Sequence, residues 1–148
     1  MAKNLLSTSR SLPIALLRAR ERVMGPIRAM LVDAKVTEQQ WRVLRVLHES
    51  GALDPTRIAE QACLLLPSLT RILQKLEEKA LIQREPDLSD KRKQIVQITK
   101  SGAALIEANF EASIAAMEKV RTQMGPDRYE ALLDLLNELD ASDTGCKR

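Results

Sequence analysis

The hydrophobic periodicity of the chain changes at one place, after Lys79. Between residues 11 and 79 apolar side chains recur at intervals of three and four, which is typical of amphipathic helices. Residues 81–84 and 94–99 then alternate between apolar and polar side chains, which is typical of short β-strands. From Thr99 onward the helical spacing returns. The sequence therefore predicts a mainly α-helical fold that contains one small β-hairpin.

The composition agrees with one globular domain and argues against a membrane protein. Of the 148 residues, 45% are apolar and 29% are charged, which are ordinary values for a soluble domain. The longest apolar run, residues 62–67, is far shorter than the roughly 20 residues that cross a bilayer. Polar residues 7–10 interrupt the N-terminal leucines before a secretory segment can form. We therefore expect a cytoplasmic protein without membrane contact.

Local signals mark where several helices begin and end. Thr37 is followed three residues later by Gln40, which is a capping-box pattern for a helix that Gly51 would end. Asp54 precedes a proline and is expected to cap the next helix. The Gly-Pro pair at 25–26 lies inside the apolar stripe of the first helix. Because proline removes a backbone donor, we expect a kink or a break there.

Two short helices, residues 55–62 and 67–79, are joined by a tight turn and followed by the hairpin. This order is that of a winged helix-turn-helix, whose second helix enters the major groove of DNA. The outward face of that helix is polar and basic, with side chains three and four positions apart: Ser68, Thr70, Arg71, Gln74 and Lys75. We expect Arg71 to fork onto a guanine edge and the residues around it to contact phosphates.

The hairpin is expected to carry a basic tip. Its connector, residues 85–93, is rich in turn formers and ends in a basic run: Lys91, Arg92 and Lys93. We expect Asp90 to aim Arg92 into the adjacent minor groove, where a narrow A·T tract concentrates negative potential. The two flanking lysines would contact phosphates. Arg84, on the first strand, completes the set of predicted DNA contacts.

The charge distribution favours the same part of the chain. Residues 1–100 hold 18 lysines and arginines against 11 acidic residues, whereas residues 101–148 hold 5 against 9. Residues 1–100 should therefore contain the surface that binds an anionic partner. A run of three cations alone is usually a solvated turn. Its position after a helix, a turn, a helix and a strand is what favours DNA.

The first helix and the last two helices carry more apolar surface than the central unit can cover. Because symmetric pairing is the commonest way to bury such surface, we expect a homodimer. The predicted organisation is one intertwined domain with three regions. Residues 1–36 form the N-terminal part of the dimerisation region, residues 37–100 the winged helix-turn-helix, and residues 101–148 the C-terminal dimerisation helices.

Several motifs of the chain match those of a known family. Between residues 53 and 102 they are Ile58-Ala59, Pro67-Ser-Leu-Thr-Arg, Leu76-Glu, Asp90-Lys-Arg and Ile98-Thr-Lys-Ser-Gly. On these residues the chain resembles the MarR family of winged-helix regulators. Flanking segments resemble, more narrowly, the regulators of homoprotocatechuate degradation operons: Ser11-Leu-Pro-Ile-Ala-Leu-Leu, Arg18-Ala-Arg-Glu and Thr37-Glu-Gln-Gln-Trp-Arg. The C-terminal third resembles the family only in its helical pattern.

This resemblance implies a homodimer that binds a palindromic operator and represses transcription until an aromatic acid binds. The site would lie near the junction of the dimerisation helices and the winged unit. In the narrower subgroup the inducers are hydroxyphenylacetates and homoprotocatechuate. Ala80 departs from the family, which often has glycine there. If that position requires a positive φ angle, the alanine is strained, and the helix end is shifted or the turn has a different shape.

Residues that could hold a small aromatic carboxylate are found on the first two helices. The carboxylate needs a cation and the ring needs an apolar surface. Arg18 and Arg22 share a helix face and could supply the cation, with Trp41 as the apolar surface and Ser11 as a further donor. Each has an alternative role: the arginines in ion pairs or in solvent, Trp41 in the core, and Ser11 as a helix cap.

An oxidant sensor that switches through Cys63 is the alternative regulatory function. A reactive thiolate needs exposure and nearby cations, whereas the leucines at 64–66 favour burial of Cys63. Cys146, in the polar tail, is expected to be incidental. An enzyme is not expected, because His48 and Cys63 have no third orienting group and no phosphate-binding glycine loop is present. No metal site and no cofactor are predicted.

Overall fold

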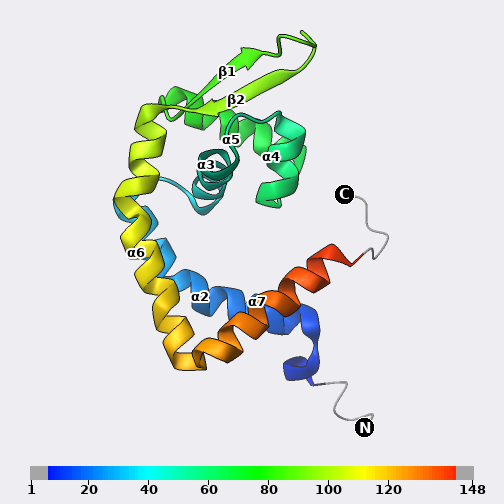
Figure 1. Ribbon diagram of the computed structural model, residues 1–148, viewed down its shortest axis with the longest axis vertical. Coiled ribbons are helices and arrows are strands. Elements are labelled where there is room, and N and C mark those ends of the chain that lie inside the picture. Colours follow the sequence, from blue (N-terminus) through cyan, green and yellow to red (C-terminus); the bar gives the residue numbers. More distant parts are fainter. Residues whose placement is uncertain (1–6, 143–148) are drawn as a thin grey trace. The chain divides into compact units, whose positions relative to one another are not determined.

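The computed structural model describes residues 7–142 and confirms a mainly helical fold with one hairpin (Figure 1). Cys146 lies outside the described residues. The elements in chain order are η1 (Thr8–Arg10), α2 (Leu12–Ala34), α3 (Glu38–Ser50), α4 (Pro55–Ala62), α5 (Leu66–Glu78), β1 (Ile82–Pro86), β2 (Gln94–Ile98), α6 (Lys100–Met124) and α7 (Pro126–Ala141).

The described chain divides into two compact units. Residues Leu31–Glu111 form one, which contains α3, α4, α5, the hairpin and the first part of α6. We call it the winged unit. The other, which we call the terminal unit, contains the described residues up to Met30 together with Ala112–Ser142.

The predicted capping box at the start of α3 is present. The Gln40 backbone N–H donates to Thr37 Oγ1 and the Thr37 N–H donates to Gln40 Oε1, each over 3.1 Å. The helix ends at Gly51, whose N–H donates to the Leu47 carbonyl. These two ends fix the length of α3, around which the winged unit is built.

The inward faces of α4 and α5 are those that the apolar spacing predicts. Asp54 caps α4, with its Oδ1 accepting the Arg57 N–H at 3.0 Å. The buried residues of α4 are Ile58, Ala59 and Ala62, and those of α5 are Leu69, Ile72, Leu73 and Leu76. Both helices contact α3 and each other. The opposite face of α5 is consequently exposed.

The hairpin closes the winged unit. β1 and β2 pair in antiparallel register from Ile82 opposite Ile98 to Pro86 opposite Gln94. β1 therefore runs two residues further than the predicted strand at 81–84, because Pro86, at its end, still pairs. The helix α6 starts directly after β2, with Thr99 Oγ1 accepting the Gly102 N–H at 3.1 Å.

Gly102 is the place where α6 approaches the hairpin most closely. A Cβ atom there would lie 2.3 Å from the Leu81 carbonyl oxygen and 2.6 Å from Ile98 Cγ1. Real Cβ atoms do not approach backbone that closely, so the position requires glycine. Because Gly102 has no side chain, α6 can start close to Leu81, just before β1, and to Ile98 at the end of β2.

Of the two outcomes expected at Gly25 and Pro26, a kink or a break, the break does not occur. The helix α2 continues through Pro26 from Leu12 to Ala34. Proline removes one backbone hydrogen bond. Just beyond it Ile27 and Met30 are buried, and their burial favours the unbroken helix.

The terminal unit leaves a row of leucines on α7 in solvent. Leu132, Leu133, Leu135 and Leu139 are each at least 39% exposed. These residues fit the expectation that the last helix needs a partner surface. None of the helices that the structure describes is long and apolar enough to span a membrane.

Ala80 adopts the left-handed conformation at the end of α5, with a φ angle of 58°. The Leu81 N–H donates to the Leu76 carbonyl at 3.0 Å, and the Ala80 N–H donates to the Glu77 carbonyl at 2.9 Å. These two bonds form a Schellman motif, which favours glycine at the position of Ala80. The backbone therefore keeps the turn that glycine would give, and the alanine carries the strain.

Ala80→Gly should raise the free energy of unfolding by about 1 kcal/mol, because glycine adopts a positive φ angle without a Cβ clash. The matched control is Ala104→Gly on the exposed side of α6, which should lower that free energy by about 0.5–1 kcal/mol. Urea unfolding measures both. Equal destabilisation by the two substitutions would contradict the strain at Ala80.

Candidate nucleic-acid interface

The exposed face of α5 contains the five residues that the sequence singles out. Ser68, Thr70, Arg71, Gln74 and Lys75 are all exposed. Between them lie the buried leucines and isoleucine that hold the helix against α3 and α4. The helix thus offers one polar, partly basic surface to solvent, as an amphipathic helix that packs on one side must.

The side chains of this face differ in the hydrogen bonds and ion pairs that they form within the chain. Thr70 Oγ1 donates to the Leu66 carbonyl at 3.1 Å, and Lys75 Nζ lies 3.4 Å from a Glu78 carboxylate oxygen. The Lys75 pair is exposed and holds the ammonium weakly. The side chain of Arg71 forms no hydrogen bond or ion pair with any other residue that the structure describes. Its planar guanidinium is therefore available for bidentate recognition.

The hairpin tip is shaped by two aspartates. Asp87 Oδ1 accepts the Ser89 N–H at 2.9 Å and the Ser89 hydroxyl at 2.8 Å, and these bonds hold the pKa of Asp87 below its ordinary range. Asp90 Oδ1 accepts the backbone N–H of Arg92 at 3.0 Å. Asp90 thus contacts Arg92 through the backbone of the turn and not through the guanidinium, and the entry of Arg92 into a minor groove stays a prediction.

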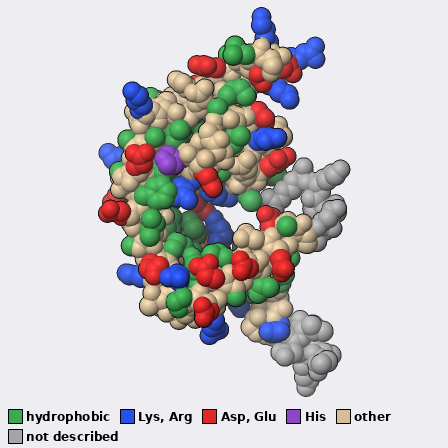
Figure 2. All heavy atoms as spheres, viewed as in Figure 1, with side chains coloured by type: hydrophobic (Ala, Val, Ile, Leu, Met, Phe, Trp, Pro, Cys, Tyr) green, Lys and Arg blue, Asp and Glu red, His purple; other side chains and the backbone are tan. Residues whose placement is uncertain are grey.

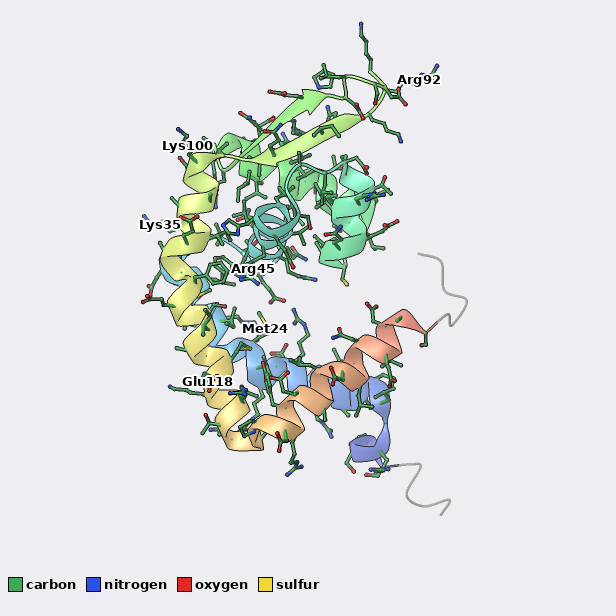
Figure 3. All side chains as sticks on the ribbon, in the orientation of Figure 1. Met24, Lys35, Arg45, Arg92, Lys100 and Glu118 are labelled. Atoms are coloured by element: carbon green, nitrogen blue, oxygen red, sulfur yellow. The ribbon has the colours of Figure 1, made fainter. Side chains whose placement is uncertain are left out.

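The cations of the tip project into solvent. Lys91, Arg92 and Lys93 are exposed, and Figure 3 shows Arg92 at the far end of the hairpin. Figure 2 shows Lys and Arg side chains gathered over the same end. Together with α5 they give the winged unit two basic features, a helix face and a hairpin tip.

Arg84 joins the hairpin to α5. Its Nη2 lies 2.9 Å and its Nε 3.2 Å from the two carboxylate oxygens of Glu77, and its side chain is only 22% exposed. The hydrogen bonds lower the pKa of Glu77 and raise that of Arg84. The Arg84 guanidinium thus holds β1 beside α5. In a direct DNA contact, the same guanidinium would have to bind both DNA and Glu77.

An open groove of about 650 Å³ lies between the start of α4 and the tip end of the hairpin. Its lining includes the tip residues Arg92 and Lys93 together with Thr56 and Arg57 of α4. Sequence reasoning missed Arg57. The available signal was a basic residue three positions after a predicted helix cap, beside the position where a helix N-terminus attracts phosphate.

The residues proposed to hold an aromatic acid belong to different units. Ser11, Arg18 and Arg22 are part of the terminal unit, where the Ser11 carbonyl accepts the Ala15 N–H and Arg18 Nη2 donates to Thr8 Oγ1 at 3.0 Å. Arg22 is exposed. Trp41 is part of the winged unit and only 7% exposed, which agrees with a place in the core.

A cation and an aromatic ring that the sequence did not single out meet one helical turn after Trp41. The Arg45 guanidinium on α3 lies 4.8 Å from the centre of the Phe110 ring of α6. The centre of the His48 ring lies 6.0 Å from that of Phe110, and its Nε2 lies 3.5 Å from a Glu107 oxygen. Arg45 is half-buried (Figure 3). This pair could supply the charge and the ring surface that an aromatic carboxylate needs.

The expected burial of Cys63 is wrong. Cys63 is exposed, with a left-handed φ angle of 53° at the end of α4. Leu65 and Leu66 are exposed too, by 67% and 48%, whereas Leu64 is half-buried. Among the residues that the structure describes, no group of His, Cys, Asp and Glu is arranged to hold a metal ion.

Comparison with known proteins shows what this arrangement is similar to. A model of the MarR family matches residues 36–93. The chain is 38% identical to the homoprotocatechuate degradative operon repressor of Escherichia coli over 131 residues, 88% of each chain. The structure of NadR in complex with 4-hydroxyphenylacetate has a TM-score of 0.80 and 38% identity, covering 88% of this chain and 92% of NadR. The repressor CouR bound to a 23-mer DNA duplex has a TM-score of 0.83 and 26% identity, covering 92% and 96%.

The link between Glu77 and Arg84 predicts a pH dependence. Because the pKa of Glu77 is lowered in the folded chain, the link is complete above the ordinary glutamate range and is lost as the pH falls through the lowered value. In an NMR titration the Arg84 Nε–Hε resonance should shift with a midpoint below that range. In Arg84→Met the Glu77 carboxyl should titrate within the ordinary range. The same Glu77 midpoint in both proteins would contradict the link.

Proposed function

This chain belongs to the MarR family of transcriptional regulators, and from that premise we propose that it represses an aromatic-acid degradation operon until a hydroxyphenylacetate-type acid binds. The observation that carries the proposal is the pairing, within one compact unit, of an exposed polar face on α5 with an exposed basic hairpin tip. No catalytic role is assigned to any residue.

The proposed complex places α5 in the major groove of duplex DNA. The Arg71 guanidinium has no partner among the described residues and can form two hydrogen bonds to a guanine edge. Ser68, Thr70, Gln74 and Lys75 would set the position of the helix, mainly through phosphates. At the hairpin, Arg92 would enter the neighbouring minor groove.

A second copy of the chain is part of the proposal. The leucines exposed on α7 give an apolar surface that a symmetric partner can bury. A two-fold dimer presents two α5 helices to one duplex, so the operator should be palindromic, with half-sites about one turn of DNA apart.

The proposed ligand is an aromatic acid of the 4-hydroxyphenylacetate type. Support comes from the ligand of NadR and from the operon that the Escherichia coli relative represses. The candidate cations are Arg18 and Arg22, to which the contact with Phe110 adds Arg45. Ser11 is the candidate hydroxyl donor, and Trp41 reports changes in its surroundings through fluorescence.

The exposure of Cys63 favours a second candidate function, oxidant sensing. An exposed thiol at the turn before α5 can be oxidised, and a bulkier or charged sulfur there would disturb the start of that helix. This alternative predicts release of DNA by peroxide, without any effect of aromatic acids.

DNA recognition is tested with duplexes selected by the protein from a randomised pool. Arg71→Ala should weaken binding to the selected duplex by about 1–3 kcal/mol and reduce the preference over random duplexes, because a base contact is lost. Lys91→Ala should weaken binding to both kinds of duplex equally, because phosphates are common to both. The measurement is fluorescence anisotropy at fixed salt. If both variants lose the same amount on selected and random DNA, the proposed division of roles is wrong.

Ligand control is tested by adding 4-hydroxyphenylacetate to the complex with the selected duplex. The acid should weaken binding by about 1–3 kcal/mol, a usual free energy of coupling between two sites. Phenylethanol derivatives that lack the carboxylate serve as the matched control and should have no effect. If instead peroxide releases the duplex, Cys63→Ser abolishes that release and the acid does nothing, the oxidant-sensing function replaces the proposed one.

A further inference from the structure

Three helices have C-terminal ends that lie in the winged unit and are followed by a left-handed residue that is not glycine. They are α2, α4 and α5, and the residues are Lys35, Cys63 and Ala80, with φ angles of 58°, 53° and 58°. Each side chain carries a steric cost that persists only when its surroundings hold the backbone. We call these three helix ends joints. The polar contacts around each joint show which side chains hold its backbone in place.

Lys79 connects two of the joints. It is the residue before Ala80, at the end of α5, and its Nζ donates to the Lys35 carbonyl at 2.7 Å. The same ammonium lies 3.3 Å from Gln40 Oε1. Its partners are thus 44 and 39 positions away along the chain. A single side chain joins the end of α5 to the joint between α2 and α3.

The contact to Gln40 reaches into the start of α3. Gln40 is a polar residue that is only 7% exposed, and its Oε1 also accepts the Thr37 N–H of the capping box. A buried acceptor has few alternative partners, so its position is well determined. Lys79 therefore contacts a buried polar group at the start of α3.

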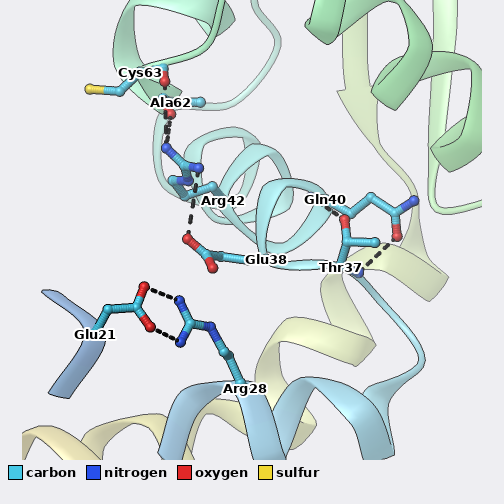
Figure 4. A network of polar contacts seen from close by, with 8 residues as sticks. All are labelled: Glu21, Arg28, Thr37, Glu38, Gln40, Arg42, Ala62 and Cys63. Carbon is cyan, nitrogen blue, oxygen red and sulfur yellow. Dashed lines mark hydrogen bonds and ion pairs between the residues drawn. The ribbon is translucent and has the colours of Figure 1, made fainter. Parts of the chain in front are cut away.

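The joint at Cys63, at the end of α4, is also held by a side chain of α3. Arg42, on α3, donates from Nη1 to the Ala62 carbonyl at 2.8 Å and lies 3.5 Å from the Cys63 carbonyl. Its Nη2 is 4.0 Å from Glu38 Oε1 (Figure 4). Consequently α3 is connected to both ends of α5. Arg42 of α3 binds the turn that precedes α5, and Lys79 at the end of α5 binds Gln40 of α3.

The position of Lys79 matters because of where the chain passes between the units. Within the described residues it does so at two places, in α2 after Met30 and in α6 after Glu111. An effect on α2 in the terminal unit can reach the winged unit along the first of these connections. The end of α2, where Lys79 binds, is one of the two.

We propose that Lys79 is a positioning residue that couples the joint between α2 and α3 to the recognition helix α5. A shift of α2 at Lys35 moves the carbonyl that Lys79 binds, and α5 follows or loses the bond. This inference rests on the proposed function, because it concerns the control of DNA binding by a ligand. It assigns Lys79 no contact with DNA or ligand.

The test compares Lys79→Met, which removes the donor, with Lys79→Arg, which keeps one. Lys100→Met is the matched control, because it removes one exposed positive charge from the start of α6 in the same unit (Figure 3). The quantity measured is the factor by which 4-hydroxyphenylacetate weakens binding to the selected duplex. That factor should fall at least about threefold in Lys79→Met and should be retained in the other two variants. An equal factor in Lys79→Met and Lys100→Met would overturn the proposal.

A second measurement does not depend on DNA or ligand. Amide hydrogen exchange in the free protein should become at least about threefold faster at Val36, Thr37 and Leu81 in Lys79→Met, with the core of α3 unchanged. If the wild-type protein neither binds the selected duplex nor responds to the acid, the proposed function fails, and exchange alone then decides the role of Lys79. Unchanged exchange at the joints would overturn it.

Discussion

The burial of one face of α5 against α3 and α4 is the constraint on which the rest of the structure depends. Leu69, Ile72, Leu73 and Leu76 are all at most 8% exposed, and each stabilises the fold by about 1.5–3 kcal/mol through its burial. A helix held in this way cannot rotate without exposing them. Its polar face, with Arg71 near the middle, is therefore presented in one fixed orientation, as recognition of a rigid duplex requires.

The cations of the winged unit divide into those that hold it together and those that remain available. Arg84 binds Glu77, Arg42 binds the turn after α4, and Lys79 binds the joint before α3. The side chains of Arg71 and of the tip cations form no such hydrogen bond with other residues that the structure describes. Both groups carry the same charge and occur in the same stretch of sequence, so net charge alone cannot separate a DNA contact from a structural link.

Local signals predicted the fold well, whereas contacts between distant residues could not be predicted. The capping box at Thr37 depends on residues three positions apart, so the sequence displays it directly. The bonds of Arg84 and Lys79 link separate elements, and no pattern along the chain marks such pairs. Cys63 was misjudged because its apolar neighbours suggested burial, although the left-handed turn carries them outward. The helix α2 does not break at Pro26, because the burial of residues beyond the proline outweighs the local signal of the proline.

The central claim, that the exposed face of α5 lies against duplex DNA, is tested most directly by photocrosslinking. A benzophenone amino acid in place of Ser68 would probe this face, and the same group in place of Thr122, exposed on α6 in the terminal unit, would be the comparison. The structure predicts crosslinks to the selected duplex from position 68, at bases of the major groove, and none from position 122. Crosslinks from position 122 but not from position 68 would contradict the claim.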